Sequence, residues 1–172
     1  LFTIITDGFT YQMKQYAIGH LLHLCYGSPM EGDASSRLSL RDRGFSAVPY
    51  EAGLDRTYSY DYLPLEVSVL GDGDFRTPGI IIEQEDGTLS ASFRYLCHRI
   101  YKGGALLEGL PCGRIGDGES LEITLKEDLS GAELILTYTA KDSSLLRGMK
   151  LVAKDKKITL KKALYSMDTI AM

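Results

Sequence analysis

The sequence has no tryptophan, no long apolar run and no excess of positive charge. Its 19 Lys and Arg residues are outnumbered by 23 Asp and Glu residues, which gives a formal net charge of −4. Nucleic acids are bound through clustered cationic side chains, so this charge balance argues against a nucleic-acid partner. A membrane-spanning helix needs about 20 consecutive apolar residues, and the sequence offers no such run. We therefore expect a soluble chain that binds neither nucleic acid nor membrane.

Cysteine is also scarce, with three residues at Cys25, Cys97 and Cys112 and no C-x-x-C spacing. A disulfide framework needs more cysteines, and a zinc ribbon needs closely spaced pairs. The chain opens with Leu-Phe-Thr instead of the basic and then apolar stretch of a secretory leader. These features favour a reducing, cytoplasmic location.

What the sequence does contain is alternation of apolar and polar residues with a period of two. The pattern is clearest over residues 121–126 and 134–141, and it is typical of half-buried strands. Turn-forming residues at 85–87, 128–131 and 154–157 predict connections and hairpins between strands. No long capped helix is expected. With 172 residues, the chain is predicted to form a single all-β domain over 1–172, most simply a sandwich.

The segment from Gly27 to Pro64 lacks this alternation and is rich in Ser, Asp, Arg, Gly and Tyr. A loop of such length in a compact domain is usually functional or disordered, and its tyrosines argue against pure disorder. We therefore look for function in this segment first. The aspartates of the loop-rich part are candidates for the carboxylate pair of a glycosidase, but acids in turns commonly just cap backbone amides. These are Asp42, Asp55, Asp61, Asp72 and Asp74.

Metal sites find little support in the sequence, and no cofactor is expected. A calcium loop that started at Asp72 would need an acid or Asn at its fifth position and Gly at its sixth, but Arg76 and Thr77 stand there. His20 and His23 are three residues apart on an expected strand, so their side chains should point to opposite faces. His98 is expected to be a hydrogen-bonded packing residue of a strand.

An ordered series of motifs runs along nearly the whole chain. It consists of Tyr11-x-Met13, Gly19-x-Leu21-x-His23, RDRGFS at 41–46, DRTYSYDYLP at 55–64, GDGDFRTP at 71–78, HRIYKG at 98–103, GLP at 109–111 and SMD at 166–168. This series resembles the amino-terminal domain of bacterial α-galactosidases of glycoside hydrolase family 36. Leu65, Val67-Ser68 and Arg147-Gly148 depart from the family pattern, which bears on specificity more than on membership.

The resemblance implies a β-supersandwich of two packed, mostly antiparallel sheets that precedes a (β/α)8 catalytic barrel. It implies a retaining enzyme that releases terminal α-galactose from melibiose and raffinose-type sugars with two aspartates of the barrel. A barrel needs about 250 residues, so it cannot fit in this chain. We therefore expect no catalytic residue here, and we expect the barrel and neighbouring subunits of a homotetramer as partners.

The resemblance also implies a sugar contact, because the irregular loop of this family reaches the sugar pocket. Asp42 and Arg56 match family positions that line the pocket, and Phe45 could offer an apolar surface to a sugar face or pack the loop onto the barrel. For Arg56 the alternative is an ordinary salt bridge within the loop. For the whole chain the alternatives are a free-standing carbohydrate-binding module and a β-sandwich with no sugar role.

Overall fold

A computed structural model of the chain describes residues 1–172 except 43, 45–47, 72, 105–114 and 165–172. Strands dominate the described residues, and the helices among them are short 3-10 turns, so the all-β prediction is confirmed. The strands are β1 (Phe2–Ile5), β2 (Thr10–Gln15), β3 (Leu21–Gly27), β4 (Ile80–Gln84), β5 (Phe93–Lys102), β6 (Glu119–Glu127), β7 (Glu133–Lys141), β8 (Ser144–Val152) and β9 (Ile158–Ala163). The 3-10 helices are η1 (Ala17–Gly19), η2 (Ala34–Arg37) and η3 (Tyr50–Ala52).

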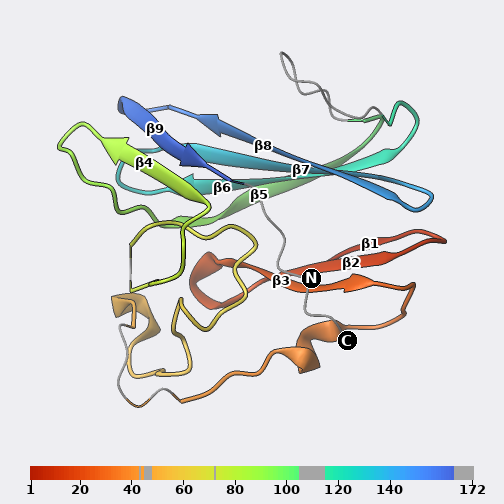
Figure 1. The fold of residues 1–172 in the computed structure, drawn as a ribbon, viewed down its shortest axis with the longest axis horizontal. Coiled ribbons are helices and arrows are strands. Elements are labelled where there is room, and N and C mark those ends of the chain that lie inside the picture. Colours follow the sequence, from red (N-terminus) through yellow and green to blue (C-terminus); the bar gives the residue numbers. More distant parts are fainter. Residues whose placement is uncertain (43, 45–47, 72, 105–114, 165–172) are drawn as a thin grey trace.

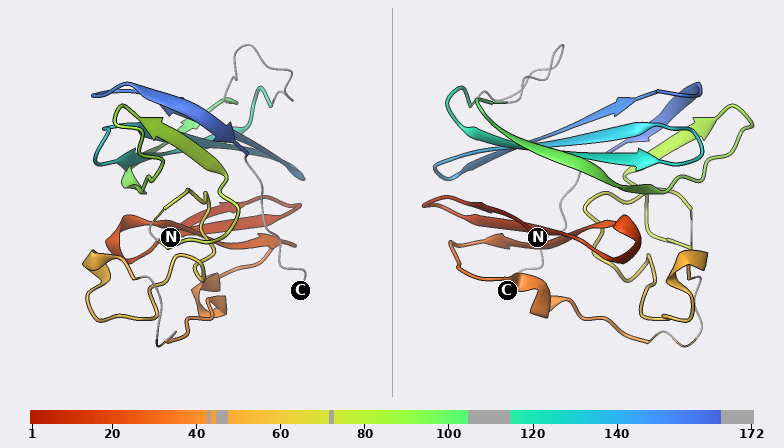
Figure 2. Two further views of the ribbon diagram at one scale, coloured as in Figure 1. Left: turned by 60° about the vertical axis from the view of Figure 1, so that its left-hand side comes forward. Right: turned by 180° about the vertical axis from the view of Figure 1, so that it is seen from behind.

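Two antiparallel sheets lie face to face (Figures 1 and 2). One has the strand order β1-β2-β3 and the other has the order β5-β6-β7-β8, while β4 and β9 form a separate pair beside the larger sheet. Apolar side chains from both sheets and from β4 form one continuous core between the layers. This arrangement confirms the predicted sandwich.

The alternating segments become the centre of the larger sheet. In β6, Leu121, Ile123 and Leu125 are buried while the residues between them are only half-buried. In β7, Leu134 and Leu136 are fully buried and face the same core. Both assignments of strand faces are therefore confirmed, because one side of this sheet packs on the core and the other side meets water.

The predicted connections are only partly right. Residues 128–131 do join β6 to β7, which pair directly. The turn at 85–87 exists, since Gly87 N bonds to Gln84 O, but β4 before it pairs with β9 and not with β5. For the same reason 154–157 leads out of the large sheet and is no hairpin. Turn residues indicate only that the chain reverses, whereas the burial of Ile80 and Ile82 decides where β4 lies.

The irregular segment after β3 runs beneath the smaller sheet in Figure 1 and is held there by buried polar side chains of β2. Gln12 Nε2 donates to Gly32 O at 2.6 Å, and Gln12 Oε1 accepts from Ala34 N at 2.9 Å. Thr10 Oγ1 accepts from Met30 N at 2.9 Å. Further along, a second apolar cluster of Leu22, Tyr58, Tyr60 and Leu63 covers the end of the segment. The two ends of this segment are therefore packed, while most of the described residues between them are exposed.

Glu66 is a carboxylate in the core, with a side chain that is 1% exposed. It accepts hydrogen bonds from Tyr11 of β2 at 2.7 Å, from Tyr138 of β7 at 2.8 Å and from Arg147 of β8 at 2.6 Å. His23 Nδ1 of β3 lies 3.4 Å from its other oxygen. Burial by itself would raise the pKa of Glu66, but His23 and Arg147 outweigh burial and the pKa is lowered. Glu66 therefore joins both sheets as an anion.

Replacing Glu66 with Gln should destabilise the fold by about 3 kcal/mol, because the Arg147 guanidinium would stay in the core without its anion. Urea denaturation followed by circular dichroism measures this change. The matched control is Asp117→Asn, which removes an exposed pair with Lys141 (Nζ to Oδ1, 2.6 Å) and should change stability little. Equal effects of the two variants would contradict a special role of Glu66.

Candidate functional site

The structure brings together two of the three residues that the sequence singled out. Arg56 Nη2 lies 3.0 Å from Asp42 Oδ2, and Arg56 Nη1 donates to Gly44 O at 3.1 Å. Asp42 Oδ1 accepts from Gly44 N at 2.7 Å. Both charged side chains remain about half exposed, at 55% for Asp42 and 54% for Arg56. The third residue, Phe45, lies outside the described residues.

Arg56 projects from a turn that is fixed on both sides. Before it, Asp55 Oδ1 accepts from the backbone N of Thr57 at 3.0 Å and from the Thr57 hydroxyl at 2.5 Å. These bonds lower the pKa of Asp55, so it stays ionised in this turn. After the turn, Tyr58 is buried to 1% exposure in the cluster with Leu22. The backbone that carries the exposed Arg56 guanidinium is therefore held in place on both sides.

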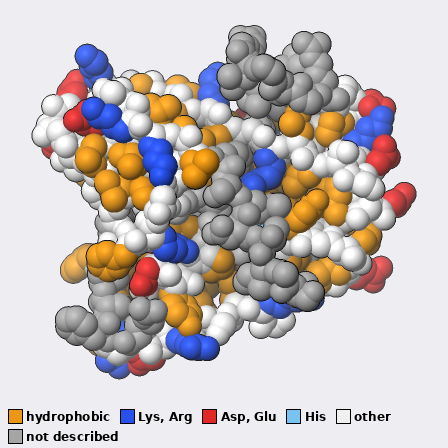
Figure 3. All heavy atoms as spheres, in the orientation of Figure 1, with side chains coloured by type: hydrophobic (Ala, Val, Ile, Leu, Met, Phe, Trp, Pro, Cys, Tyr) orange, Lys and Arg blue, Asp and Glu red, His pale blue; other side chains and the backbone are white. Residues whose placement is uncertain are grey.

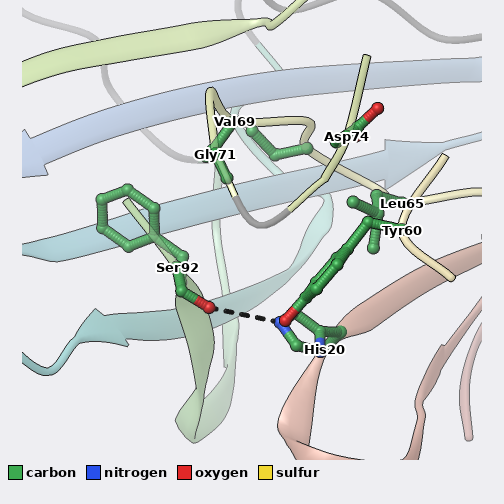
Figure 4. Close-up of a pocket in the computed structure, with 9 residues that line it drawn as sticks. His20, Tyr60, Leu65, Val69, Gly71, Asp74 and Ser92 are labelled. Atoms are coloured by element: carbon green, nitrogen blue, oxygen red, sulfur yellow. Dashed lines mark hydrogen bonds between the residues drawn. The ribbon is translucent and has the colours of Figure 1, made fainter. Parts of the chain in front are cut away.

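Tyr58 is held in place by a group of hydrogen-bonded residues. The Tyr58 hydroxyl donates its one proton to Ala17 O at 2.6 Å and also contacts His20 Nδ1. Because that proton is committed to a carbonyl, His20 must donate at Nδ1 and carry its lone pair on Nε2. Nε2 faces Ser92 Oγ at 3.4 Å (Figure 4). Burial, with a smaller effect of Arg94, lowers the pKa of His20 to about 4, and burial raises the pKa of Tyr58.

A small cavity lies beside His20 (Figure 4). Its volume is about 20 Å³, which has room for a water molecule and not for a sugar ring. Tyr60, Asp74 and Ser92 are polar members of its lining, and the rest is mostly aliphatic. This cavity is therefore not a sugar pocket. The exposed pair of Asp42 and Arg56 stays the candidate site because the motif resemblance singles out these two residues.

The described residues of the GDGDFRTP stretch have a structural role. Asp74 has a side chain that is 2% exposed and accepts from Arg76 N at 3.0 Å and from Arg76 Nε at 2.9 Å. Arg76 also donates to Leu63 O at 2.8 Å, so it holds the end of the irregular segment. Gly71 has φ of +130°, and a Cβ there would lie 2.1 Å from Ser90 Oγ. The predicted local bonding of Asp74 is confirmed, while Asp72 lies outside the described residues.

The histidines are separated in the fold. His20 lies just before β3, beside Tyr58, whereas His23 lies within β3, beside Glu66. The expectation that both belong to one strand is wrong, because η1 ends at Gly19 and β3 begins only at Leu21, so His20 lies between the two elements. His98 Nδ1 shares a hydrogen bond with the Tyr95 hydroxyl at 2.7 Å, as expected, but the His98 side chain is exposed.

Among the residues that the structure describes, no three His, Cys, Asp or Glu side chains are grouped so that they could hold a metal ion. In the same part of the chain, no helix has the length and apolar character that crossing a membrane requires.

Comparison with known proteins decides the family. The model of the family described as Glycosyl hydrolase family 36 N-terminal domain matches residues 19–168, a range that contains Asp42, Arg56 and Glu66. The chain belongs to this family. The glycoside hydrolase family 36 (GH36) chain is 41% identical over 140 residues to the bifunctional α-galactosidase/sucrose kinase AgaSK of Mediterraneibacter gnavus. It is 38% identical over 135 residues to the α-galactosidase AgaA of Geobacillus stearothermophilus.

Solved structures agree with this assignment. The galactosidase domain of AgaSK matches 94% of the GH36 chain with a TM-score of 0.89 at 36% identity, and AgaA matches 95% with a TM-score of 0.87 at 33% identity. The matched sequences make up 80% and 76% of the present chain but only 15% of AgaSK and 18% of AgaA. The chain therefore corresponds to a minor part of these longer enzymes. Variants of AgaA have been solved in complex with raffinose and with stachyose.

His20 predicts a pH dependence of stability in mildly acidic solution. Its pKa is about 4 in the folded chain and about 6.5 in an unfolded one, so between these values the unfolded chain binds the extra proton and stability falls as the pH falls. From about pH 7.5 to about pH 5 the loss should be about 2 kcal/mol. Urea denaturation at both pH values measures it.

The matched variants are His20→Gln and His98→Gln. His20→Gln cannot take the proton, so this part of the pH dependence should disappear whatever the variant costs at neutral pH. His98 is exposed, and His98→Gln should leave the dependence as it is. Parallel pH profiles for wild type and His20→Gln would show that His20 is not buried in its neutral form.

Proposed function

We propose that this GH36 domain is the non-catalytic amino-terminal β-sandwich of an α-galactosidase, and that it lends the loop with Asp42 and Arg56 to the sugar pocket of the complete enzyme. The observation that carries the proposal is the pairing of these two side chains at an exposed loop, within a family whose relatives are α-galactosidases. The two reacting carboxylates are assigned to the barrel, which needs about 250 residues of its own.

The chemistry of the pair suits a sugar. Each carboxylate oxygen of Asp42 accepts one bond from the protein, from Gly44 N or from Arg56, and each oxygen keeps a further lone pair for a sugar hydroxyl. Arg56 uses two of its five N–H groups on Asp42 and Gly44, so others can reach ring or linkage oxygens. Because the protein already orients the carboxylate, the Asp42 side chain loses less conformational freedom when a sugar binds.

The substrate class we propose is terminal α-galactosides of the melibiose and raffinose type. The support is that AgaA, a relative whose structure superimposes on this chain with a TM-score of 0.87, has been solved with raffinose and stachyose in variant forms. Phe45 keeps its proposed role as an apolar surface in the same loop.

We also propose contacts with the barrel and with neighbouring subunits of a homotetramer. Large apolar side chains on described loops support this, because Tyr50 is 96% exposed, Leu54 is 98% exposed and Phe75 is 86% exposed. Figure 3 shows that hydrophobic side chains gather in patches on one face of the molecule. Such side chains commonly mark interaction surfaces. The free thiols of Cys25 and Cys97 favour a reducing compartment such as the cytoplasm.

In the full-length enzyme, Asp42→Ala should reduce kcat/KM for raffinose roughly 10- to 100-fold, the range expected when a charged hydrogen bond to the substrate is lost. Steady-state kinetics measure the change, and circular dichroism checks that the fold is intact. Asp117→Ala is the control, since Asp117 is likewise an exposed acid paired with a cation. Unchanged kinetics in Asp42→Ala would remove this residue from the sugar site.

The alternative is a free-standing carbohydrate-binding module, and the isolated chain distinguishes the two. With half a pocket, it should hydrolyse no nitrophenyl galactoside and should bind galactose, melibiose and raffinose no tighter than about 1 mM. Calorimetric titration measures the affinity. Saturable binding with a Kd well below about 1 mM would favour the carbohydrate-binding module.

A further inference from the structure

Tyr58 lies two residues after Arg56 and is held by ring contacts and hydrogen bonds. Its ring stacks on Tyr16, with centroids 5.5 Å apart and planes 16° apart, and meets the Tyr60 ring edge-on at 6.0 Å. Its side chain is buried beneath the loop, with the residue 1% exposed. The tyrosine is therefore a fixed point next to an exposed functional candidate.

The hydroxyl of Tyr58 adds two directional bonds to this packing. It donates to Ala17 O at 2.6 Å and accepts from His20 Nδ1; Ala17 is the first residue of the 3-10 turn η1, and His20 follows its last residue. Backbone strain is also present in this turn, since Ile18 has φ of +56°. We call Tyr58, His20 and the Ala17 carbonyl the tyrosine latch. The latch holds the loop to a turn of the sandwich that is 38 to 41 residues distant in sequence.

The tyrosine latch is linked to the Asp42 carboxylate by a short stretch of backbone and a few hydrogen bonds. Only Thr57 separates Tyr58 from Arg56, and Asp55 holds Thr57 through both its backbone and its hydroxyl. Arg56 then bonds to Asp42 Oδ2 and to Gly44 O. A shift of Tyr58 would therefore move the guanidinium that orients the carboxylate.

We propose that Tyr58 is a positioning residue for the sugar contact of Asp42, and that the tyrosine latch sets the place of Arg56 and, through it, of the carboxylate. The inference rests on the proposed function of Asp42. Tyr58 itself touches no substrate, since it is buried beneath the loop. Its hydroxyl thus affects sugar binding at a distance, through backbone and through Arg56.

The test is Tyr58→Phe in the full-length enzyme, with raffinose as substrate. This variant keeps the stacked ring and removes both bonds of the hydroxyl. KM should rise roughly 3- to 10-fold, the effect of about one hydrogen bond, while kcat stays near that of wild type. A merely structural role would lower the amount of active enzyme, and therefore the apparent kcat, without raising KM.

Tyr138→Phe is the matched control, because Tyr138 is an equally buried tyrosine that bonds to Glu66 on the other side of the core. It should lower thermal stability and leave KM unchanged. A rise in KM equal to that of Tyr58→Phe would overturn the inference. Should Tyr58→Phe fail to fold, His20→Leu removes one of the two bonds of the same hydroxyl and should still raise KM; an unchanged KM there would also overturn the inference.

A double-mutant cycle separates this inference from the proposed function. If the latch acts through Asp42, then Tyr58→Phe should raise KM much less in an Asp42→Ala background than in wild type. Full additivity would overturn the latch and leave Asp42 in the site, as would a normal KM in Tyr58→Phe alone. If Asp42→Ala leaves both kcat and KM unchanged, the proposed function is wrong, and the inference about Tyr58 is wrong with it.

Discussion

The buried carboxylate of Glu66 is the interaction on which the sandwich depends. It follows directly on the irregular segment and receives bonds from Tyr11, Tyr138 and Arg147, which lie on strands of both sheets. An anion in an apolar core is tolerated only when cations and donors surround it. The strands of both sheets must therefore bring their donors to Glu66 for the charge to be stabilised. The same contacts that join the layers also fix the end of the segment that began at β3.

Order in the irregular segment comes from side chains and not from strand pairing. Gln12 holds its first part, and the tyrosine latch and Arg76 hold its last part, Arg76 through the Leu63 carbonyl. Each of these anchors lies on the sandwich or in its connecting turns. The exposed pair of Asp42 and Arg56 can therefore have a defined geometry while facing water, which a loop that carries a binding function requires.

The sequence predicts the parts of this fold in which one signal determines the outcome. Alternation over 121–126 and 134–141 identifies strand faces, because burial of one face of a sheet leaves that pattern. The pairing of β4 with β9 was not predictable from turns, which give a reversal and no partner. Glu66 was missed as well, although the one charged residue in the mostly apolar stretch 65–70 is a usable signal. The resemblance supplied Asp42 and Arg56, and geometry added their pairing.

The pairing of β4 with β9 has a consequence for biosynthesis. β4 ends at residue 84, whereas its partner begins only at Ile158, so a ribosome must add more than 70 residues before the pair can form. During that interval β4 is an unpaired edge that carries the apolar side chains of Ile80 and Ile82, the kind of segment that joins to other chains. Translation that stalls before β9 should thus leave a nascent chain in need of a chaperone, even when the larger sheet β5-β6-β7-β8 has already formed.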